Sequence, residues 1–272
     1  MSGMFYPANP EVLRRDIERY LENAVFDAIE GNVTGMISPH AGYTYSGPVA
    51  AYGYKSLLGK AYDTVIVIAP SHRMHFEGVA IQDKGGYRTP LGMVDIDEDI
   101  SEEILKSSAV NMNLKAHTGE HSLEVQIPFL QVVLKSFMLV PLVMGTQDLS
   151  ICEDLSRCLL EAVQKSGKQC LIIGSSDLSH YYPYEKAVNI DNIIVEHLER
   201  FDIKGLEEDF NRSKCEACGF GTMITTMMVA EKFGATGSRV LKYANSGDVS
   251  GDRSGVVGYV SAVFYKSSEN KE

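Results

Sequence analysis

Three histidines in this sequence follow short apolar runs, a placement typical of metal-binding side chains at the edge of a β-sheet. His40 follows "VTGMISP", His72 follows "TVIVIAPS" and His180 follows "CLIIGSSDLS". Short, largely β-branched runs predict strands that are covered on both faces. Because ligands bind outside the carboxyl ends of parallel strands, imidazoles at those ends can share a metal ion.

The interval from His40 to His72 is the length of one strand–helix–strand unit with a right-handed crossover. If the two strands are neighbours, they lie about 4.8 Å apart and both imidazoles emerge at the same edge. Each histidine taken singly also fits a structural role, such as satisfying a loop carbonyl. His197, in the helix-like "IIVEHLERF", is expected to be structural, and His75 and His117 have no comparable context.

A site with two histidines normally needs an anionic third ligand, and the candidates are Asp177, Glu124 and Cys218. Cys218 precedes an apolar helix predicted from Thr222 to Phe233, whose dipole would favour a thiolate. A buried cysteine also serves as a small apolar side chain. Cys215 and Cys218 form a single C-x-x-C, which is weak support for a zinc ribbon or a thioredoxin-type motif.

Other groupings of reactive residues are less informative. His121 and Glu124 in "EHSLEVQIP" would share one face of a helix, where they could position a proton or form a surface ion pair. "GSSDLSH" contains Ser, Asp and His but lacks the second glycine of a nucleophile elbow, which disfavours a serine hydrolase. "NSGDVSGDRSG" misses the EF-hand spacing and is predicted to be a glycine-rich loop.

The elements that position these residues alternate between strands and helices. Strands are predicted at 33–38, 64–70, 137–145, 170–174 and 258–265, with Pro141 placing its strand at an edge or a bend. Helices are predicted at 10–23 after Asn9, at 47–58 from Pro48, and at 150–167 with a Ser150–Glu153 capping box and a stop at Gly167. This pattern predicts a three-layer α/β sandwich with a mainly parallel central sheet, as a single domain over 1–272.

The composition excludes several classes of protein. Acidic residues outnumber basic ones by 36 to 25, and no basic cluster exceeds a pair, which argues against a nucleic-acid partner. No signal peptide and no apolar run long enough to span a membrane is evident, so we expect a cytoplasmic protein without a membrane partner. The five cysteines are expected to be thiols.

The motifs together resemble the Memo family, whose prokaryotic members are called protein B of the AmmeMemoRadiSam system. The matching segments run from Phe5 to Asp248 in the family's order: "FYPANP", "ISPHAGYTYSG", "APSH", "YRTPLG", "EHSLEVQIPFL", "LVPLVMG", "SSDLSHY", "CGFG" and "YANSGD". The resemblance implies a fold similar to the class III, non-haem iron extradiol dioxygenases, with a metal site at the carboxyl edge of the sheet.

The resemblance also assigns roles to individual residues. His40 and His72 match the two histidine ligands, and Cys218 stands where those dioxygenases have a glutamate. His180 matches an acid/base histidine, and Asp177 and His121 are expected to line the same pocket. Thiolate is softer and more easily oxidised than carboxylate, which shifts the preference toward copper or zinc. With the iron site of the resembling dioxygenases also taken into account, we expect iron or copper, with zinc as an alternative.

The resulting hypothesis is an oxidoreductase that acts on a small molecule, with an aromatic substrate as one option. In it His180 transfers a proton, Asp177 orients His180, and Tyr43 and Tyr45 contact the substrate. The alternatives are a non-catalytic module that binds a peptide or protein beside a vestigial metal site, and a metal-dependent hydrolase. The family name implies radical SAM and AMMECR-type partner proteins.

Overall fold

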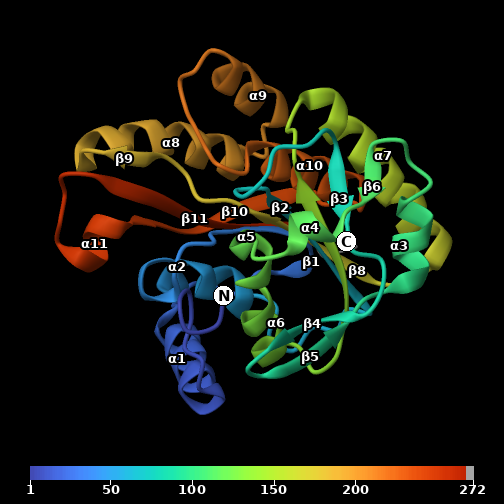
Figure 1. Cartoon of the computed structure of the whole chain (residues 1–272). Helices are drawn as coiled ribbons and strands as arrows, with labels where there is room; N and C mark the ends of the chain where they lie inside the picture. Colours follow the sequence, from blue (N-terminus) through green and yellow to red (C-terminus); the bar gives the residue numbers. More distant parts are fainter. Residues whose placement is uncertain (268–272) are drawn as a thin grey trace, which may run out of the picture.

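A nine-stranded mixed sheet runs through the centre of the molecule in the computed structural model, which describes residues 1–267 (Figure 1). Its main path is β10-β11-β1-β8-β2-β7-β3-β6, and β9 pairs with β11. The four strands β1, β8, β2 and β7 are parallel, as predicted. The strands of this sheet are β1 (Gly31–Ser38), β2 (Thr64–Pro70), β3 (Val79–Ile81), β6 (Val110–Met112), β7 (Met138–Met144), β8 (Cys170–Ser175), β9 (His180–Tyr182), β10 (Gly237–Asn245) and β11 (Val256–Ser267).

Two expectations about this sheet are corrected. β1 and β2 are not neighbours, because β8 lies between them and pairs with both. β7 is an interior strand rather than an edge, with β2 on one side and β3 on the other. Pro141 is tolerated there because β3 pairs only with residues from Leu142 to Met144, so the missing N–H falls outside that ladder.

Helices cover both faces of the sheet, which confirms the three-layer α/β prediction (Figure 1). Packed on one face are α3 (Glu98–Ile104), α7 (Leu149–Ser166), α8 (Tyr184–Arg200), α9 (Ile203–Asn211) and α10 (Phe220–Lys232). The other face carries α1 (Pro10–Asn23), α2 (Tyr43–Lys55), α4 (Leu114–His117), α5 (His121–Glu124) and α6 (Ile127–Val133). A hairpin of β4 (Gly86–Thr89) and β5 (Gly92–Asp95), and the short α11 (Ser246–Ser250), complete the described residues.

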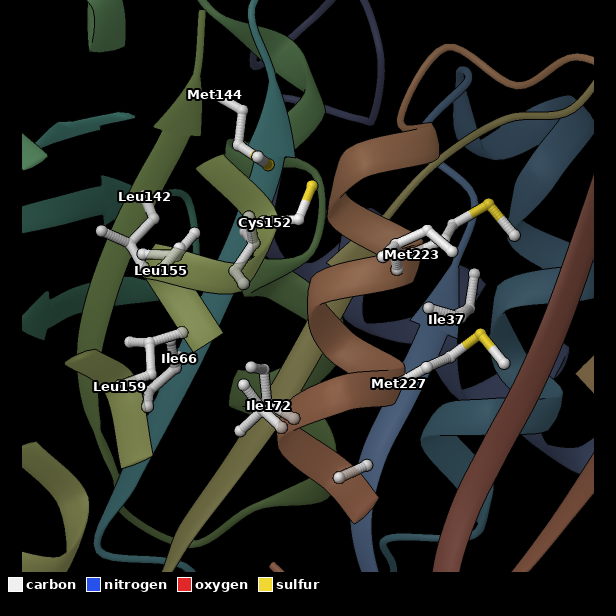
Figure 2. Close-up of a cluster of buried hydrophobic side chains, with 14 of the residues drawn as sticks. Ile37, Ile66, Leu142, Met144, Cys152, Leu155, Leu159, Ile172, Met223 and Met227 are labelled. Atoms are coloured by element: carbon white, nitrogen blue, oxygen red, sulfur yellow. The ribbon is translucent and has the colours of Figure 1, made fainter. Parts of the chain in front are cut away.

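Alternate residues of each central strand serve the two layers. Ile66 and Ile68 of β2 join the cluster beneath α7 and α10, whereas Val65 and Val67 join the cluster beneath α1, α2 and α6. Figure 2 shows the first cluster, in which Met223 and Met227 of α10 lie against the central strands. Full burial of each such side chain contributes about 1.5–3 kcal/mol to the folding free energy, so the helices on both faces stabilise the sheet.

The helices depart from the sequence expectations at two predicted starts and in one predicted loop. α2 begins at Tyr43 after Gly42, and Pro48 lies inside it, because Ser46 and the backbone N–H of Tyr43 anchor an earlier first turn on Ala41 and Phe5.

α7 begins after Asp148, without the predicted capping box, although it ends at Gly167 (φ +65°) as expected. The predicted glycine-rich loop contains α11, where Asn245 and Asp248 form a capping box. α1 begins after Asn9, as predicted.

Candidate metal centre

The predicted site residues lie at the carboxyl edge of three adjacent parallel strands. β1, β8 and β2 end two residues before His40, Asp177 and His72, respectively. Cys218 does not follow a strand but lies two residues before the first residue of α10. One ligand atom from each of His40, His72 and Cys218 lies within 4.8 Å of the others. The order of the strands therefore brings together the residues that the resemblance assigns to a metal.

The distances within this group fit a shared ion. The His40 Nε2 atom is 3.1 Å from the Cys218 sulfur, and the ring centroids of His40 and His72 are 5.1 Å apart. Although β8 separates the two parent strands, the residues that follow β1 and β2 turn inward over its end. Two imidazoles and a thiolate form a donor set suited to copper, zinc or iron.

The hydrogen bonds of His40 fix its tautomer. Its Nδ1 atom is 2.8 Å from the Ser175 hydroxyl oxygen, and that hydroxyl donates its proton to the carbonyl of Ser122. His40 must therefore donate through Nδ1–H. Burial, followed by the charges of the neighbouring histidines, lowers the pKa of His40 well below its usual value, so the ring is neutral and Nε2 carries a lone pair. This is the form that binds a metal ion.

His72 is fixed in the same way by Glu120. The His72 Nδ1 atom is 3.1 Å from Glu120 Oε1, and its backbone N–H donates to Oε2 at 2.6 Å. Burial would raise the pKa of Glu120, but the hydrogen bonds from His72 and Ser122 outweigh it and lower the pKa to about 2. An ionised carboxylate only accepts hydrogen bonds, so Nδ1–H donates and Nε2 is free.

Glu120 is the functional residue that the sequence analysis missed. It directly precedes His121, and its side chain is 1% exposed. Glu124, expected as a third metal ligand or as the i+3 partner of His121, instead accepts hydrogen bonds from Tyr6 and the Met1 amino group. The useful signal was the acidic residue beside a histidine in "GEHS", because carboxylate–histidine pairs commonly orient metal ligands.

Cys218 lies against the chain that carries Asp177. Its sulfur accepts the backbone N–H of Asp177 at 3.3 Å, and its own N–H donates to the Asp177 carbonyl. Burial, followed by the charge of Asp177, raises the pKa of the Cys218 thiol well above its usual range. The α10 dipole was expected to favour the thiolate, but burial acts in the opposite direction and is the stronger effect at this position.

Asp177 supports His40 rather than His180. Its Oδ1 atom accepts the backbone N–H of His40 at 2.7 Å, which ties the end of β1 to the end of β8. Burial raises the pKa of Asp177 to about 7, and the hydrogen bonds from His40 and Ala41 limit that rise. The predicted orienting contact from Asp177 to His180 is replaced by this backbone contact.

His180 is the first residue of β9, a short strand that follows β8 in the sequence. It does not lie directly at the end of β8. Its Nδ1 atom is 2.8 Å from the Leu178 carbonyl oxygen, which can only accept, so the ring donates through Nδ1–H. Burial lowers the pKa of His180, which leaves a neutral ring with a basic Nε2 atom. This is the protonation state that a general base requires.

His121 also lies among the site histidines, as expected. Its ring centroid is 4.6 Å from that of His72 and 5.5 Å from that of His40, and Phe5 stacks on it at 4.4 Å. Burial, followed by electrostatic repulsion from the neighbouring His72 ring, lowers the pKa of His121 to about 4. His121 is therefore a neutral ring near pH 7.

The two tyrosines expected to contact a substrate have different environments. Tyr43 is 4% exposed and donates its hydroxyl to the Val125 carbonyl, so it belongs to the core beneath the site. Tyr45 is 41% exposed. Both lie in the first turn of α2 rather than in a loop. Residues two positions apart in a helix lie on nearly opposite sides of its axis, so one ring points inward and the other outward.

The remaining residue-level expectations concern structural roles. His197 lies on α8, where it pairs with Asp202 and Asp209, as a structural histidine would. All five cysteines are free thiols. Within residues 1–267, no helix is long and apolar enough to cross a membrane.

Some known proteins are similar to this chain in sequence, and one solved structure is similar to it in fold. A family model described as "Memo-like protein" matches residues 1–263. MEMO1 family proteins of Methanopyrus kandleri and Sulfolobus acidocaldarius are 38% and 39% identical to this chain, over 97% of each chain. An uncharacterized protein of Escherichia coli K12 superposes with a TM-score of 0.55 at 13% identity, covering 85% of this chain and 99% of that one, which shows a shared fold. The chain belongs to the family of Memo-like proteins.

Proposed function

We propose that this protein binds a redox-active metal ion through His40, His72 and Cys218 and uses it in an oxidoreductase reaction on a small aromatic molecule. The observation that carries the proposal is the pair of fixed tautomers. Ser175 and Glu120 each hold a histidine in the form whose Nε2 atom is free to bind a metal. A general structural role for these histidines would not require both rings to present a lone pair to the same thiol.

Imidazole and thiolate suit iron, copper and zinc. We propose iron or copper because these two supply redox chemistry, and zinc, which does not, is the alternative. When bound, the ion would supply Lewis-acid and redox chemistry at this edge of the sheet.

The chain's own residues contribute proton transfer and positioning. His180 would accept a proton at Nε2 from a substrate hydroxyl, since its Nδ1–H is already committed to Leu178. Asp177 holds the backbone of His40 in place, and Glu120 orients His72. In keeping with the family resemblance, we propose that a radical SAM partner acts in the same process, which copurification of the two proteins would test.

Metal analysis of protein purified without oxygen tests the first part of the proposal. We expect about one equivalent of iron or copper in the unaltered protein and its loss in His40→Ala and in Cys218→Ala. His75→Ala is the matched control, because His75 is an exposed histidine close in sequence to His72. Failure of the unaltered protein to bind iron, copper or zinc under any loading condition would refute the metal site.

Oxygen consumption with a panel of catechols tests the reaction class. Iron-loaded protein is expected to consume oxygen with at least one catechol, and His180→Gln should slow this consumption while the metal stays bound. If the loaded protein consumes no oxygen with any catechol, ring cleavage is excluded. Binding of a peptide or partner protein at the same residues, without turnover, would then favour the non-catalytic alternative.

A further inference from the structure

Tyr181 has an unusual backbone conformation beside the site. Its φ angle is +65°, a region that disfavours residues with a Cβ atom because that atom crowds the following carbonyl. The pairing of β9 with β11 explains the angle. Val256 is paired with Tyr182 and Val257 with His180, so Tyr181 is the extra residue of a β-bulge. Bulges beside active sites redirect side chains, and glycine is the residue best suited to this conformation.

The side chain of Tyr181 contributes little burial energy to the stability of the fold. It is 79% exposed, the most exposed large aromatic side chain in residues 1–267. A large apolar ring in solvent adds no burial energy that would offset the strain at its backbone. Strained residues persist where the surrounding structure holds them and often coincide with ligand sites.

The position of the ring points to a ligand above His180. The ring centroids of His180 and Tyr181 are 5.7 Å apart, with the rings at 66°.

We propose that the bulge at Tyr181 holds its phenol ring as a stacking platform for a planar aromatic ligand beside His180. The proposal rests on the proposed function and specifies its substrate class. Offset stacking on a tyrosine ring distinguishes a flat, unsaturated ring from a saturated ring of similar size and polarity. It also explains why tyrosine occupies a position that favours glycine.

Binding of catechol and of cis-cyclohexane-1,2-diol, measured by calorimetry on the metal-loaded protein, tests the platform. The two ligands carry the same pair of hydroxyls but differ in aromaticity. We expect the unaltered protein to prefer catechol and Tyr181→Gly to reduce that preference about three- to ten-fold. Tyr181→Phe should retain it, because the ring remains, whereas Tyr181→Ala should lose it.

Thermal unfolding separates backbone strain from ligand contact. Tyr181→Gly is expected to raise the Tm by about 1–3 °C, since relief of the positive φ angle outweighs the added flexibility of the unfolded chain. Tyr181→Ala keeps the Cβ atom and should give no such increase. Ser213→Gly is the matched control, because Ser213 is an exposed residue with φ +55° in the turn after α9 and is not part of the bulge. It should raise the Tm similarly without altering catechol binding.

The two proposals fail in different ways. An equal affinity of the unaltered protein for catechol and the saturated diol, or an unchanged preference in Tyr181→Gly, would overturn the platform even if the metal is bound. Conversely, an aromatic preference that depends on Tyr181 in a protein without metal would support the platform while the proposed metal chemistry fails.

Discussion

The sharpest test of the site is Glu120→Gln, because its effect follows from a count of donors and acceptors. The two carboxylate oxygens of Glu120 face four donors: the backbone N–H and the ring Nδ1–H of His72, and the backbone N–H and the hydroxyl of Ser122. Glutamine offers only one acceptor oxygen. Whichever way its amide is turned, the NH₂ group faces at least one of these donors.

One orientation of the new amide also changes the ligand itself. If the NH₂ group faces the ring of His72, Nδ1 must become the acceptor and the proton moves to Nε2, which removes the lone pair needed by a metal. Loss of such a supporting contact typically lowers metal affinity 10- to 100-fold, or about 1.4–2.7 kcal/mol. An unsatisfied buried donor costs a further ~1–3 kcal/mol of folding stability.

A competition titration of iron or copper against a chromophoric chelator would measure the affinity, and urea unfolding would measure the stability. Glu124→Gln is the matched control. It removes the same charge from the neighbouring one-turn helix, but Glu124 pairs with Tyr6 and the Met1 amino group rather than with His72. Equal metal affinity in Glu120→Gln and in the unaltered protein would refute the claim that Glu120 sets the tautomer of His72.

Two further predictions concern the framework around the site. In Gly219→Ala the new Cβ would collide with the Ser175 carbonyl and push Cys218 away from the histidines. We expect this variant to lose about 1–3 kcal/mol of folding stability and to bind metal more weakly. The control is Gly42→Ala, which should bind metal normally because no atom lies closer than 3.7 Å to its new Cβ. At the opposite edge of the sheet, burial alone would raise the pKa of Asp97, but hydrogen bonds, chiefly from Lys168 at 2.8 Å, lower it below 3.8. This contribution to stability is present above about pH 4 and lost as pH falls through the lower folded value, so Asp97→Asn should cost roughly 2 kcal/mol at pH 7 and flatten the acid side of the urea-unfolding profile. Equal pH profiles of the two proteins between pH 2 and 7 would contradict the assignment.

The sequence predicted the strands that carry the site, because continuous apolar runs are a local signal. The predicted strands at 33–38, 64–70 and 170–174 coincide with β1, β2 and β8 within a few residues. Helix starts were less predictable. Pro48 and Ser150 are common starting residues, but contacts from Phe5 and from the loop before α7 moved the true starts to Tyr43 and Leu149.

Family resemblance and strand ends together predicted His40, His72 and Cys218 as ligands. They did not predict Ser175 and Glu120, which set the tautomers of the two histidines. Glu120 was missed because its role depends on donors that come from a different part of the chain. Tyr43 was assigned to the substrate because sequence shows residue type and not direction. Whether a first-turn tyrosine points into the core or toward solvent depends on the layer packed beneath it.

Local chemistry, then, determined the elements of this protein and the residues at their ends, because hydrophobic periodicity and caps act over a few residues. Only the tertiary structure decided that β8 lies between β1 and β2, so that Ser175 reaches His40 and Asp177 ties the two strand ends together. The same holds for Tyr181, whose bulge exists only because β9 pairs with β11. Tautomers, pKa shifts and backbone strain all depend on neighbours distant in sequence, so they are set only when the chain has folded.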